Sequence, residues 1–218
     1  RLLATELDHA EAILKDMGPP IAAASIAQVH VATHRETGQK LAVKFLRPGV
    51  EERLRAELAL LGRVAKWAER FFPITHRLRP VDAITTLARS INGETDFRME
   101  AAALSEMAEN TQQDKGFRVP DIIWEASGRR VLTMSWIEGV SAADIEGLQK
   151  DGHDLSDLAT RLLQIFLTLV LRDGFFHADM HQGNLLVQKD GTIVAIDLGI
   201  CGRLDKDSRR FLAEILHG

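Results

Sequence analysis

The sequence predicts an α+β protein with two lobes, from the order of its elements and from its composition. Turn residues at 34–39 separate two strand-like segments, helical patterns occupy the middle of the chain, and a second short hairpin lies at 185–196. The 218 residues are enough for one large domain or two small lobes with a buried core. We expect the lobes at residues 1–138 and 139–218, because Gly139 follows an apolar strand.

The composition excludes several classes of protein. Hydrophobic residues make up 45% and charged residues 27%, which is ordinary for a globular chain. The net charge of -4 does not indicate a nucleic-acid binder, which usually has a basic face. With one cysteine, Cys201, the chain has no intrachain disulfide. The longest apolar run, 162–171, is about half the length needed to span a bilayer, so we expect a buried helix there.

The first lobe begins with residues of helical spacing. Leu3, Leu7, Ala10 and Leu14 share one face, so we expect a helix over 2–17 that Gly18, Pro19 and Pro20 end. A hairpin is expected next, with an unusual first strand in 21–32, a turn at 34–39 and a returning strand at 41–46. A helix should follow over 50–72, with one apolar side formed by Leu54, Leu58, Leu61, Ala65 and Ala68.

Helical patterns and short strands continue to the C-terminus. We expect helices over 81–91, 94–110 and 156–172, with Ser156 as the N-cap of the last, and strands at 131–137, 185–187 and 193–196. The chain begins at Arg1 and ends at Gly218 inside a helical pattern, so we expect the fold to be truncated at both ends.

Three polar residues near the C-terminal hairpin have the spacing of a phosphoryl-transfer site. Asp179 is followed five residues later by Asn184, and Asp197-Leu198-Gly199 follows across the predicted hairpin. ATP-dependent phosphoryl transfer needs one carboxylate to orient the acceptor, and an Asn and a second Asp to hold Mg²⁺. The spacing matches the kinase catalytic loop and metal loop. The combination therefore predicts a protein-kinase-like fold with ATP and Mg²⁺ as cofactors.

A lysine in the first lobe extends this pattern. Lys44 ends Leu41-Ala42-Val43-Lys44, which has the form of the strand lysine of kinases. A kinase pairs this lysine with a glutamate on a helix, and the predicted helix over 94–110 supplies Glu94, Glu100, Glu106 and Glu109. For Glu106 and Glu109 we favour a solvated helix face.

Other chemically active side chains have plainer interpretations. His177 and His181 are four residues apart, but Gly183 and the following strand favour a loop over a helical metal pair. We expect His177 to be structural and Cys201 to pack near the metal loop without acting as a nucleophile. Trp136 could stack on a cofactor, although we favour core or hinge packing.

Several segments resemble the UbiB/ABC1 family of atypical kinases. The alanine-rich run from Pro20 to His30 resembles the family's replacement for a glycine-rich loop, and Glu94-Thr95-Asp96 resembles its E-x-D motif. The segment 131–139 resembles the strand that leads into the hinge, and 174–179 resembles the entry to the catalytic loop. The resemblance runs from about residue 18 to the C-terminus.

The resemblance implies a role for each matching residue. Asp179 would be the catalytic Asp, Lys44 the nucleotide-binding lysine and Glu100 its ion-pair partner. Asn184 and Asp197 would hold Mg²⁺. The remaining nucleotide-binding positions would be Ala22, Ala23, Ala24 and Ser25 over the phosphates, Glu94 and Asp96 near the active site, and the backbone of Ser135, Trp136 and Ile137 at the adenine. Alanine restricts the close backbone approach that glycine permits, so a different nucleotide pose is expected.

The chain departs from the family pattern at a few positions. Met180 and Gln182 stand where the catalytic loop usually has Pro, Leu198 stands where the metal loop has Phe, and Ser135 stands where the hinge strand often has an acidic residue. These changes remove no catalytic group. The family's N-terminal K-x-G-Q motif is absent from this sequence.

The resemblance implies an ATPase or kinase that supports ubiquinone biosynthesis. ATP and ADP would be its ligands; isoprenoid quinone precursors, membrane lipid and quinone-biosynthesis enzymes would be its partners at the cytoplasmic side of a bacterial inner membrane. Two alternatives stay open: a nucleotide-sensing scaffold with little turnover, and a small-molecule phosphotransferase of the aminoglycoside or choline kinase type. The alanine-rich run and the E-x-D motif count against the latter.

Overall fold

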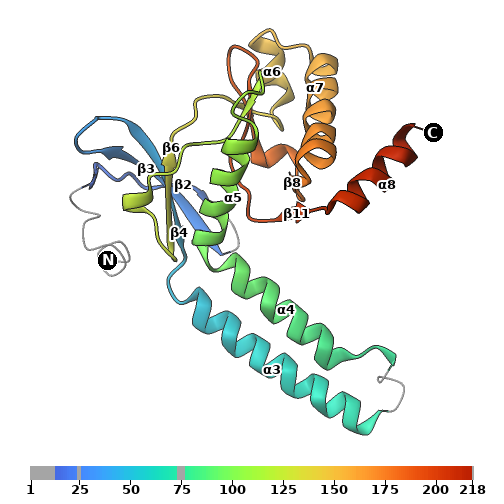
Figure 1. Ribbon diagram of the computed structural model, residues 1–218. Coiled ribbons are helices and arrows are strands. Elements are labelled where there is room, and N and C mark those ends of the chain that lie inside the picture. The colour runs from blue at the N-terminus through green and yellow to red at the C-terminus, as the bar shows by residue number, and fades with distance from the viewer. Residues whose placement is uncertain (1–12, 24–25, 73–76, 218) are drawn as a thin grey trace. The chain divides into compact units, whose positions relative to one another are not determined.

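The computed structural model describes residues 13–23, 26–72 and 77–217 (Figure 1). The chain forms two compact units, which alternate along the sequence. The first comprises Arg1–Gly38, Ala42–Met99 and Trp124–Thr133, and the second comprises Gln39–Leu41, Glu100–Ile123 and Met134–Gly218. The expected lobes at 1–138 and 139–218 stay a prediction. Of the helix expected over 2–17, residues 2–12 lie outside the described residues, and the described end is a strand.

The core of the first unit is an antiparallel sheet. Its strands are β1 (Leu14–Lys15), β2 (Pro20–Ala23), β3 (Ala27–His34), β4 (Lys40–Leu46) and β6 (Val131–Ser135), in the order β1-β3-β4-β6 with β2 paired to β3. Along β4, Leu41, Val43 and Phe45 are buried while Lys44 is half-buried, the alternation of a strand with one face on the core. Gly38, at φ +71°, closes the turn expected at 34–39. The returning strand is confirmed.

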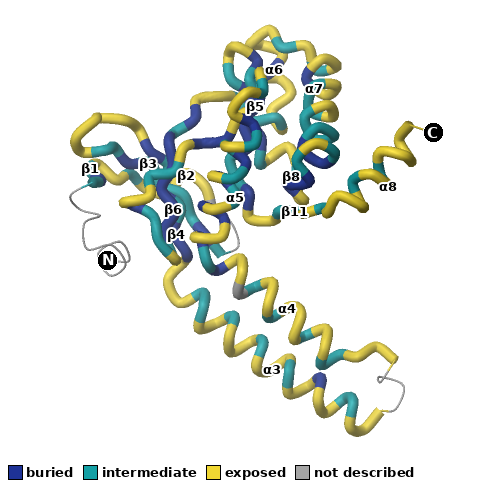
Figure 2. Tube along the Cα trace, viewed as in Figure 1, coloured by how far each residue is buried: buried dark blue, intermediate teal, exposed yellow. Residues whose placement is uncertain are grey.

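A helical hairpin follows β4 in the first unit (Figure 1). Its helices are α3 (Val50–Phe71) and α4 (Pro80–Glu94). Ala65 of α3 is buried and Leu54, Leu58 and Ala68 are half-buried, whereas Leu61 is 43% exposed. The predicted inner face is therefore confirmed apart from Leu61. Figure 2 shows both helices largely exposed beyond their shared face.

The E-x-D segment contains the break between two helices, which the sequence predicted a few residues earlier, between helices over 81–91 and 94–110. Glu94 ends α4, and the next helix, α5, spans Phe97–Asn110. Asp96 lies between them, and its side-chain Oδ1 accepts a hydrogen bond from the Arg98 N–H at 3.2 Å. An Asp in front of a helix caps its first turn in this way and favours a new start. The helix expected over 94–110 is therefore present as α5, but its expected start at Glu94 was wrong, because Glu94 is the last residue of α4.

Two further sheets form the second unit. One sheet has four strands in the order β5 (Phe117–Arg118), β10 (Ile193–Ala195), β9 (Leu185–Val187) and β7 (Val140–Ser141). The other sheet pairs β11 (Cys201–Arg203) with β8 (Phe175–His177). The expected hairpin at 185–196 is β9 and β10, and Gly191 in its turn has φ +83°. The second unit also contains α6 (Ile145–Lys150), α8 (Lys206–His217) and the 3₁₀ turn η4 (Gln182–Asn184). The 3₁₀ turn η2 (Trp124–Ala126) belongs to the first unit.

The apolar helix before the predicted catalytic loop ends in a π-helical turn that the sequence did not predict. α7 spans Leu155–Thr168, and a π-helical turn, η3 (Leu169–Asp173), replaces its last residues. Asp154, not Ser156, is the N-cap, since its carboxylate accepts hydrogen bonds from the N–H groups of Ser156 and Asp157.

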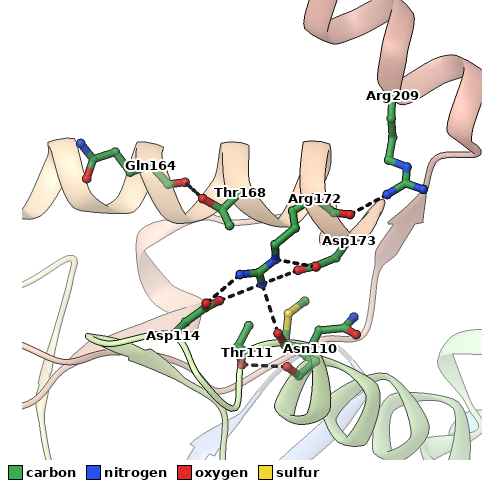
Figure 3. A network of polar contacts seen from close by, with 9 residues as sticks. Asn110, Thr111, Asp114, Gln164, Thr168, Arg172, Asp173 and Arg209 are labelled. Carbon is green, nitrogen blue, oxygen red and sulfur yellow. Dashed lines mark hydrogen bonds and ion pairs between the residues drawn. The ribbon is translucent and has the colours of Figure 1, made fainter.

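An arginine fixes the end of this helix (Figure 3). The Arg172 guanidinium contacts both carboxylate oxygens of Asp114, at 2.7 and 2.9 Å, and both of Asp173, and it donates to the carbonyl of Asn110. A planar guanidinium suits such paired contacts. The network ties η3 to the end of α5, so the segment that enters β8 is held in place.

Candidate active site

Main-chain hydrogen bonds within the second unit join the predicted catalytic loop to the predicted metal loop. β8 pairs with β11, which places Cys201 opposite His177. Beyond that pairing, the Ala178 N–H donates to the Ile200 carbonyl at 2.9 Å, and the Ile196 N–H donates to the Asn184 carbonyl at 2.9 Å. The two loops are therefore held side by side by backbone groups.

Asp179 and Asn184 contact each other inside the catalytic loop. The Asn184 Nδ2 donates to the Asp179 carbonyl at 3.3 Å. Since a carbonyl can only accept, this contact fixes the amide orientation and directs Asn184 Oδ1 away from it. The loop is also stabilised by His181 Nδ1, which accepts from the Gly183 N–H at 3.0 Å. The Asp179 side chain is 55% exposed, which agrees with the predicted role of a carboxylate that meets an acceptor.

The donor set fits a magnesium ion. Asp197 is half-buried, and its Oδ1 accepts a hydrogen bond from the Gly199 N–H at 2.9 Å, which orients the carboxylate. Asn184 and Asp197 together supply amide and carboxylate oxygens. Across the described ranges, no cluster of three or more His, Cys, Asp or Glu forms a metal cage. Mg²⁺ characteristically takes one or two protein oxygens and completes its shell with phosphates and water.

His177 is a structural residue in the described part of the chain. It is 1% exposed, and its Nδ1 lies 3.1 Å from the Asp179 N and 3.2 Å from the Ile200 carbonyl. Burial lowers the pKa of His177, which favours the neutral ring. These contacts support the predicted structural role over a metal pair with the exposed His181.

Cys201 packs against the metal loop. Its Sγ lies 3.4 Å from the Leu198 carbonyl, and burial raises the pKa of the thiol to about 11. A thiol that keeps its proton at neutral pH is a poor nucleophile. This geometry agrees with the packing role expected from the sequence.

The first unit contains the predicted phosphate-binding residues. Lys44 on β4 places its Nζ 5.4 Å from the ring centroid of Phe97, the buried first residue of α5. Ala22 and Ala23 belong to β2, with Ala22 exposed and opposite Val29 in β3. The predicted contributors Ala24 and Ser25 lie outside the described residues.

The E-x-D carboxylates differ in their surroundings. Glu94 is exposed at the end of α4, while Asp96 pairs with the Arg98 guanidinium at 2.6 Å. That hydrogen bond holds the pKa of Asp96 below its usual value. Thr95 between them is buried, and its hydroxyl donates to the Ile91 carbonyl at 3.1 Å, a contact that the E-x-D pattern does not predict.

The glutamates of α5 separate into three environments. Glu100 is 6% exposed, which agrees with an inward-facing functional residue, although its pairing with Lys44 stays a prediction. Glu106, expected on a solvated face, instead forms a two-pronged ion pair with Arg203 of β11. Glu109 is exposed, as expected. The ion pair was not predictable, because Glu106 and Arg203 are far apart in sequence.

The predicted hinge residues follow β6. The Ser135 N–H donates to the Asp121 carbonyl at 2.8 Å, and the Trp136 N–H donates to the Lys40 carbonyl at 3.1 Å. The Trp136 ring is half-buried, with Lys40 Nζ 4.3 Å from its centroid. These contacts favour hinge packing for Trp136. Gly139 is required after them, because a Cβ there would lie 2.8 Å from the Val187 carbonyl oxygen.

The α+β fold and the joined Asp–Asn–Asp loops are those of a protein-kinase-like domain. The comparison with known families specifies it further. The model of the ABC1 atypical kinase-like domain matches residues 4–218, and the chain belongs to this family.

Relatives with curated names support this assignment. The chain is 37% identical over 203 residues to a protein of Aliivibrio salmonicida and 40% identical over 201 residues to one of Marinobacter nauticus, each named "Probable protein kinase UbiB". The matches cover 91% and 90% of this chain and 37% of each relative, so the chain spans little more than a third of their length.

A solved structure shares the fold. The complex of Rv3197 with erythromycin from Mycobacterium tuberculosis has a TM-score of 0.73 and 30% identity to this chain, and covers 90% of this chain and 48% of that one. Among the residues that the structure describes, no helix has both the length and the apolar character needed to cross a membrane.

Proposed function

We propose that this chain is the nucleotide-binding part of a UbiB-type ATPase or kinase that uses ATP and Mg²⁺. The observation that carries the proposal is the hydrogen-bonded pair of loops that holds Asp179, Asn184 and Asp197 in one compact unit. Membership of the ABC1 family supports it.

Each residue has a chemical task in this proposal. Asp179, exposed and close in sequence to the turn η4, orients the hydroxyl or water that attacks the γ-phosphate and accepts its proton. Asn184 Oδ1 and the Asp197 carboxylate hold Mg²⁺, which when bound neutralises charge on the phosphates. Lys44 binds the α/β-phosphates and Glu100 orients it. Ala22 to Ser25 cover the phosphates, Glu94 and Asp96 support the site, and the backbone of Ser135 to Ile137 binds adenine.

The biological setting is proposed from the printed names of the relatives. UbiB-named proteins at 36–40% identity support a role in ubiquinone biosynthesis, with quinone precursors and quinone-biosynthesis enzymes as partners. Membrane lipid and the cytoplasmic side of a bacterial inner membrane belong to the same proposal.

ATP hydrolysis by the wild-type chain and by Asp179→Asn tests the enzymatic part. Phosphate release is measured with and without Mg²⁺, anionic vesicles and a phenolic mimic of a quinone precursor. Removing a group that acts on the transferring proton typically costs 10²- to 10⁴-fold in rate, so we expect at least a hundredfold loss. Asp151→Asn, at an exposed Asp of the same unit, is the matched control and should keep full activity.

The outcomes separate the enzyme from the scaffold. Mg²⁺-dependent turnover that Asp179→Asn abolishes supports an ATPase or kinase. Nucleotide binding without turnover in either protein under any of these conditions would leave a nucleotide-sensing scaffold. Turnover that survives Asp179→Asn contradicts the role given to that residue.

A further inference from the structure

An apolar groove lies within the second unit, lined by residues of α6, α7 and the hairpin of β9 and β10. Its cavity volume is about 240 Å³, and ten of its eleven lining residues are aliphatic. An apolar cavity of about 150 Å³ already accepts a benzene ring, so this groove has room for about two aliphatic side chains. Five buried residues form its floor: Leu148, Leu158, Leu185, Val187 and Ile193.

Main-chain hydrogen bonds hold the walls of this groove in place. The Ala142 N–H donates to the Leu185 carbonyl at 2.9 Å, which ties the segment before α6 to the start of β9. The His153 N–H donates to the Leu148 carbonyl at 3.0 Å and closes the turn between α6 and α7. Because the fold itself maintains the groove, a ligand that enters it loses little affinity to reorganisation of the protein.

The rim of the groove is open to solvent and mainly apolar. Ile145 on α6 is 44% exposed, and Ala159 on α7 is exposed as well. Gln182 of η4, also exposed, is the one lining residue with a polar side chain. Exposed aliphatic residues beside an apolar hollow form a surface that the apolar side chains of a partner can cover.

The segment that forms two walls of the groove is strongly acidic. Residues 144–157, which include α6 and the start of α7, contain five acidic residues and one basic residue, Lys150. The resulting net charge of -4 equals that of the whole chain. The five acidic residues are all exposed: Asp144, Glu146, Asp151, Asp154 and Asp157. The groove therefore lies in a negative field, which attracts cations and repels phosphate and carboxylate groups.

Local structure explains only part of this charge. Asp144 and Asp154 are the N-caps of α6 and α7, and their carboxylates accept main-chain hydrogen bonds. Within the described residues, Glu146 and Asp151 have no ion-pair partner. Asp151 also follows the C-terminal end of α6, where a negative charge is unfavourable to the helix. These two charges are available to a partner, and replacing them leaves both caps intact.

We infer that this groove docks a short peptide segment of a partner protein, in which Lys or Arg residues lie next to aliphatic residues. The aliphatic side chains of the peptide fill the cavity, and its basic side chains contact the acidic segment 144–157. The same charge repels nucleotides and anionic membranes, and a neutral small molecule gains nothing from it. The inference goes beyond the proposed function and is independent of it, because it uses none of the residues assigned to ATP or Mg²⁺.

Fluorescence anisotropy of a labelled peptide added to the 218-residue chain tests the inference. The probe is a synthetic peptide in which arginines precede alternating leucines, and we expect saturable binding that weakens as salt is raised. Two matched peptides replace either the arginines or the leucines by serine, and each should bind about tenfold more weakly. Equal binding of either matched peptide contradicts the combined apolar and charged recognition.

Variants of the chain test whether the peptide occupies the groove. Ala159→Gln places a long polar side chain at the rim without changing a buried residue, and should weaken binding by about tenfold. Glu146→Gln combined with Asp151→Asn should weaken binding by about fivefold, because exposed ion pairs are individually weak. Unchanged affinity in both variants contradicts docking at this groove.

Matched controls separate the groove from general stickiness. Leu163→Ser removes a leucine of α7 that is 58% exposed and does not line the groove. Glu52→Gln combined with Asp207→Asn removes two exposed acidic residues of other helices. Both should bind the peptide like the wild type, and thermal unfolding of every variant checks that it is folded.

Amide chemical shifts measured by NMR report the location without any substitution. The peptide should shift the signals of Leu148, Leu162 and Gln182, which line the groove. Failure of the peptide to bind, or shifts confined to other parts of the chain, would overturn the inference. If hexanol shifts these signals and the peptide does not, the groove belongs to a small apolar molecule. If sedimentation shows a dimer that Ala159→Gln dissociates, the occupant is a second copy of this chain.

The two proposals can fail separately. Peptide binding is measured without nucleotide, whereas the ATPase assay is run without peptide. Loss of one result therefore leaves the other unaffected.

Discussion

Gly174→Ala is expected to destabilise the segment that leads into the catalytic loop through both backbone strain and a steric clash. Gly174 ends η3 directly before β8 and has φ +66°. A Cβ at this position would lie 2.6 Å from the carbonyl oxygen of Leu204, a distance that real Cβ atoms essentially never show. The Leu204 N–H also donates to the Gly174 carbonyl at 2.8 Å, so the two backbones cannot separate without losing that bond.

The magnitude has two parts. The left-handed backbone alone costs an alanine about 1–2 kcal/mol. The steric contact adds about 1–3 kcal/mol, the usual range for overpacking that forces a backbone shift. Gly152 isolates the first part, since it has φ +86° and a Cβ added there would meet nothing within 4 Å. We therefore expect Gly174→Ala to lose about 2–5 kcal/mol and Gly152→Ala about 1–2 kcal/mol.

Denaturant unfolding of the two variants beside the wild type measures this difference. The midpoints are compared in urea, with fluorescence and circular dichroism followed together to check for a single transition. Equal losses for the two variants would refute the steric argument and leave only the cost of the backbone conformation.

Two further predictions concern titratable groups. At pH 8 the Cys201 thiol should react with iodoacetamide about a hundredfold more slowly than in the urea-unfolded chain, because its pKa is raised to about 11; equal rates would contradict the packing against Leu198. The Arg172 guanidinium lowers the pKa of Asp114, so this carboxylate stabilises the fold above its unfolded pKa of about 3.9 and loses that effect as the pH falls through its folded pKa. Asp114→Asn should therefore reduce the unfolding free energy by up to about 1 kcal/mol at pH 7, with the deficit closing in acid; a deficit that persists at low pH would contradict the ionic origin.

The sequence predicted much of the fold because local signals agreed with the final structure. Periodicity or turn residues in the sequence matched the observed element in four places: the turn at 34–39, the strand at Lys44, the long helix α3 and the last hairpin. The kinase-like class followed from Asp179, Asn184 and Asp197, whose spacing is legible in a single sequence. The comparisons confirmed the family that the motifs resembled.

The errors arose where a local signal was overridden or a contact was distant in sequence. Leu14 has helical spacing with earlier residues, yet it pairs with His34 in a strand, since the sheet supplies hydrogen bonds that a short helix end does not. The predicted break at 92–93 came before the real one, because Asp96 caps α5 and the helix begins only at Phe97. The expected N-cap Ser156 lost to Asp154, which stands two residues earlier.

Part of the candidate site has no signature in the sequence at all. The carbonyl of Ile200 accepts the Ala178 N–H and lies beside the His177 ring, yet any residue type supplies a carbonyl. The roles of Lys44, Glu100 and the hinge residues stay predictions, which rest on motif resemblance and on the burial of Glu100.

The main-chain hydrogen bonds between the two loops have a consequence for sequence variation. Ala178 is hydrogen-bonded to Ile200, and Ile196 to Asn184, through main-chain groups alone. The distance between the loops is therefore independent of which side chains they carry. Met180 and Gln182 can replace proline, and Leu198 can replace phenylalanine, while Asp179, Asn184 and Asp197 keep their spacing. A scaffold of this kind lets the side chains of the loops vary while the backbone positions of Asp179, Asn184 and Asp197 stay the same.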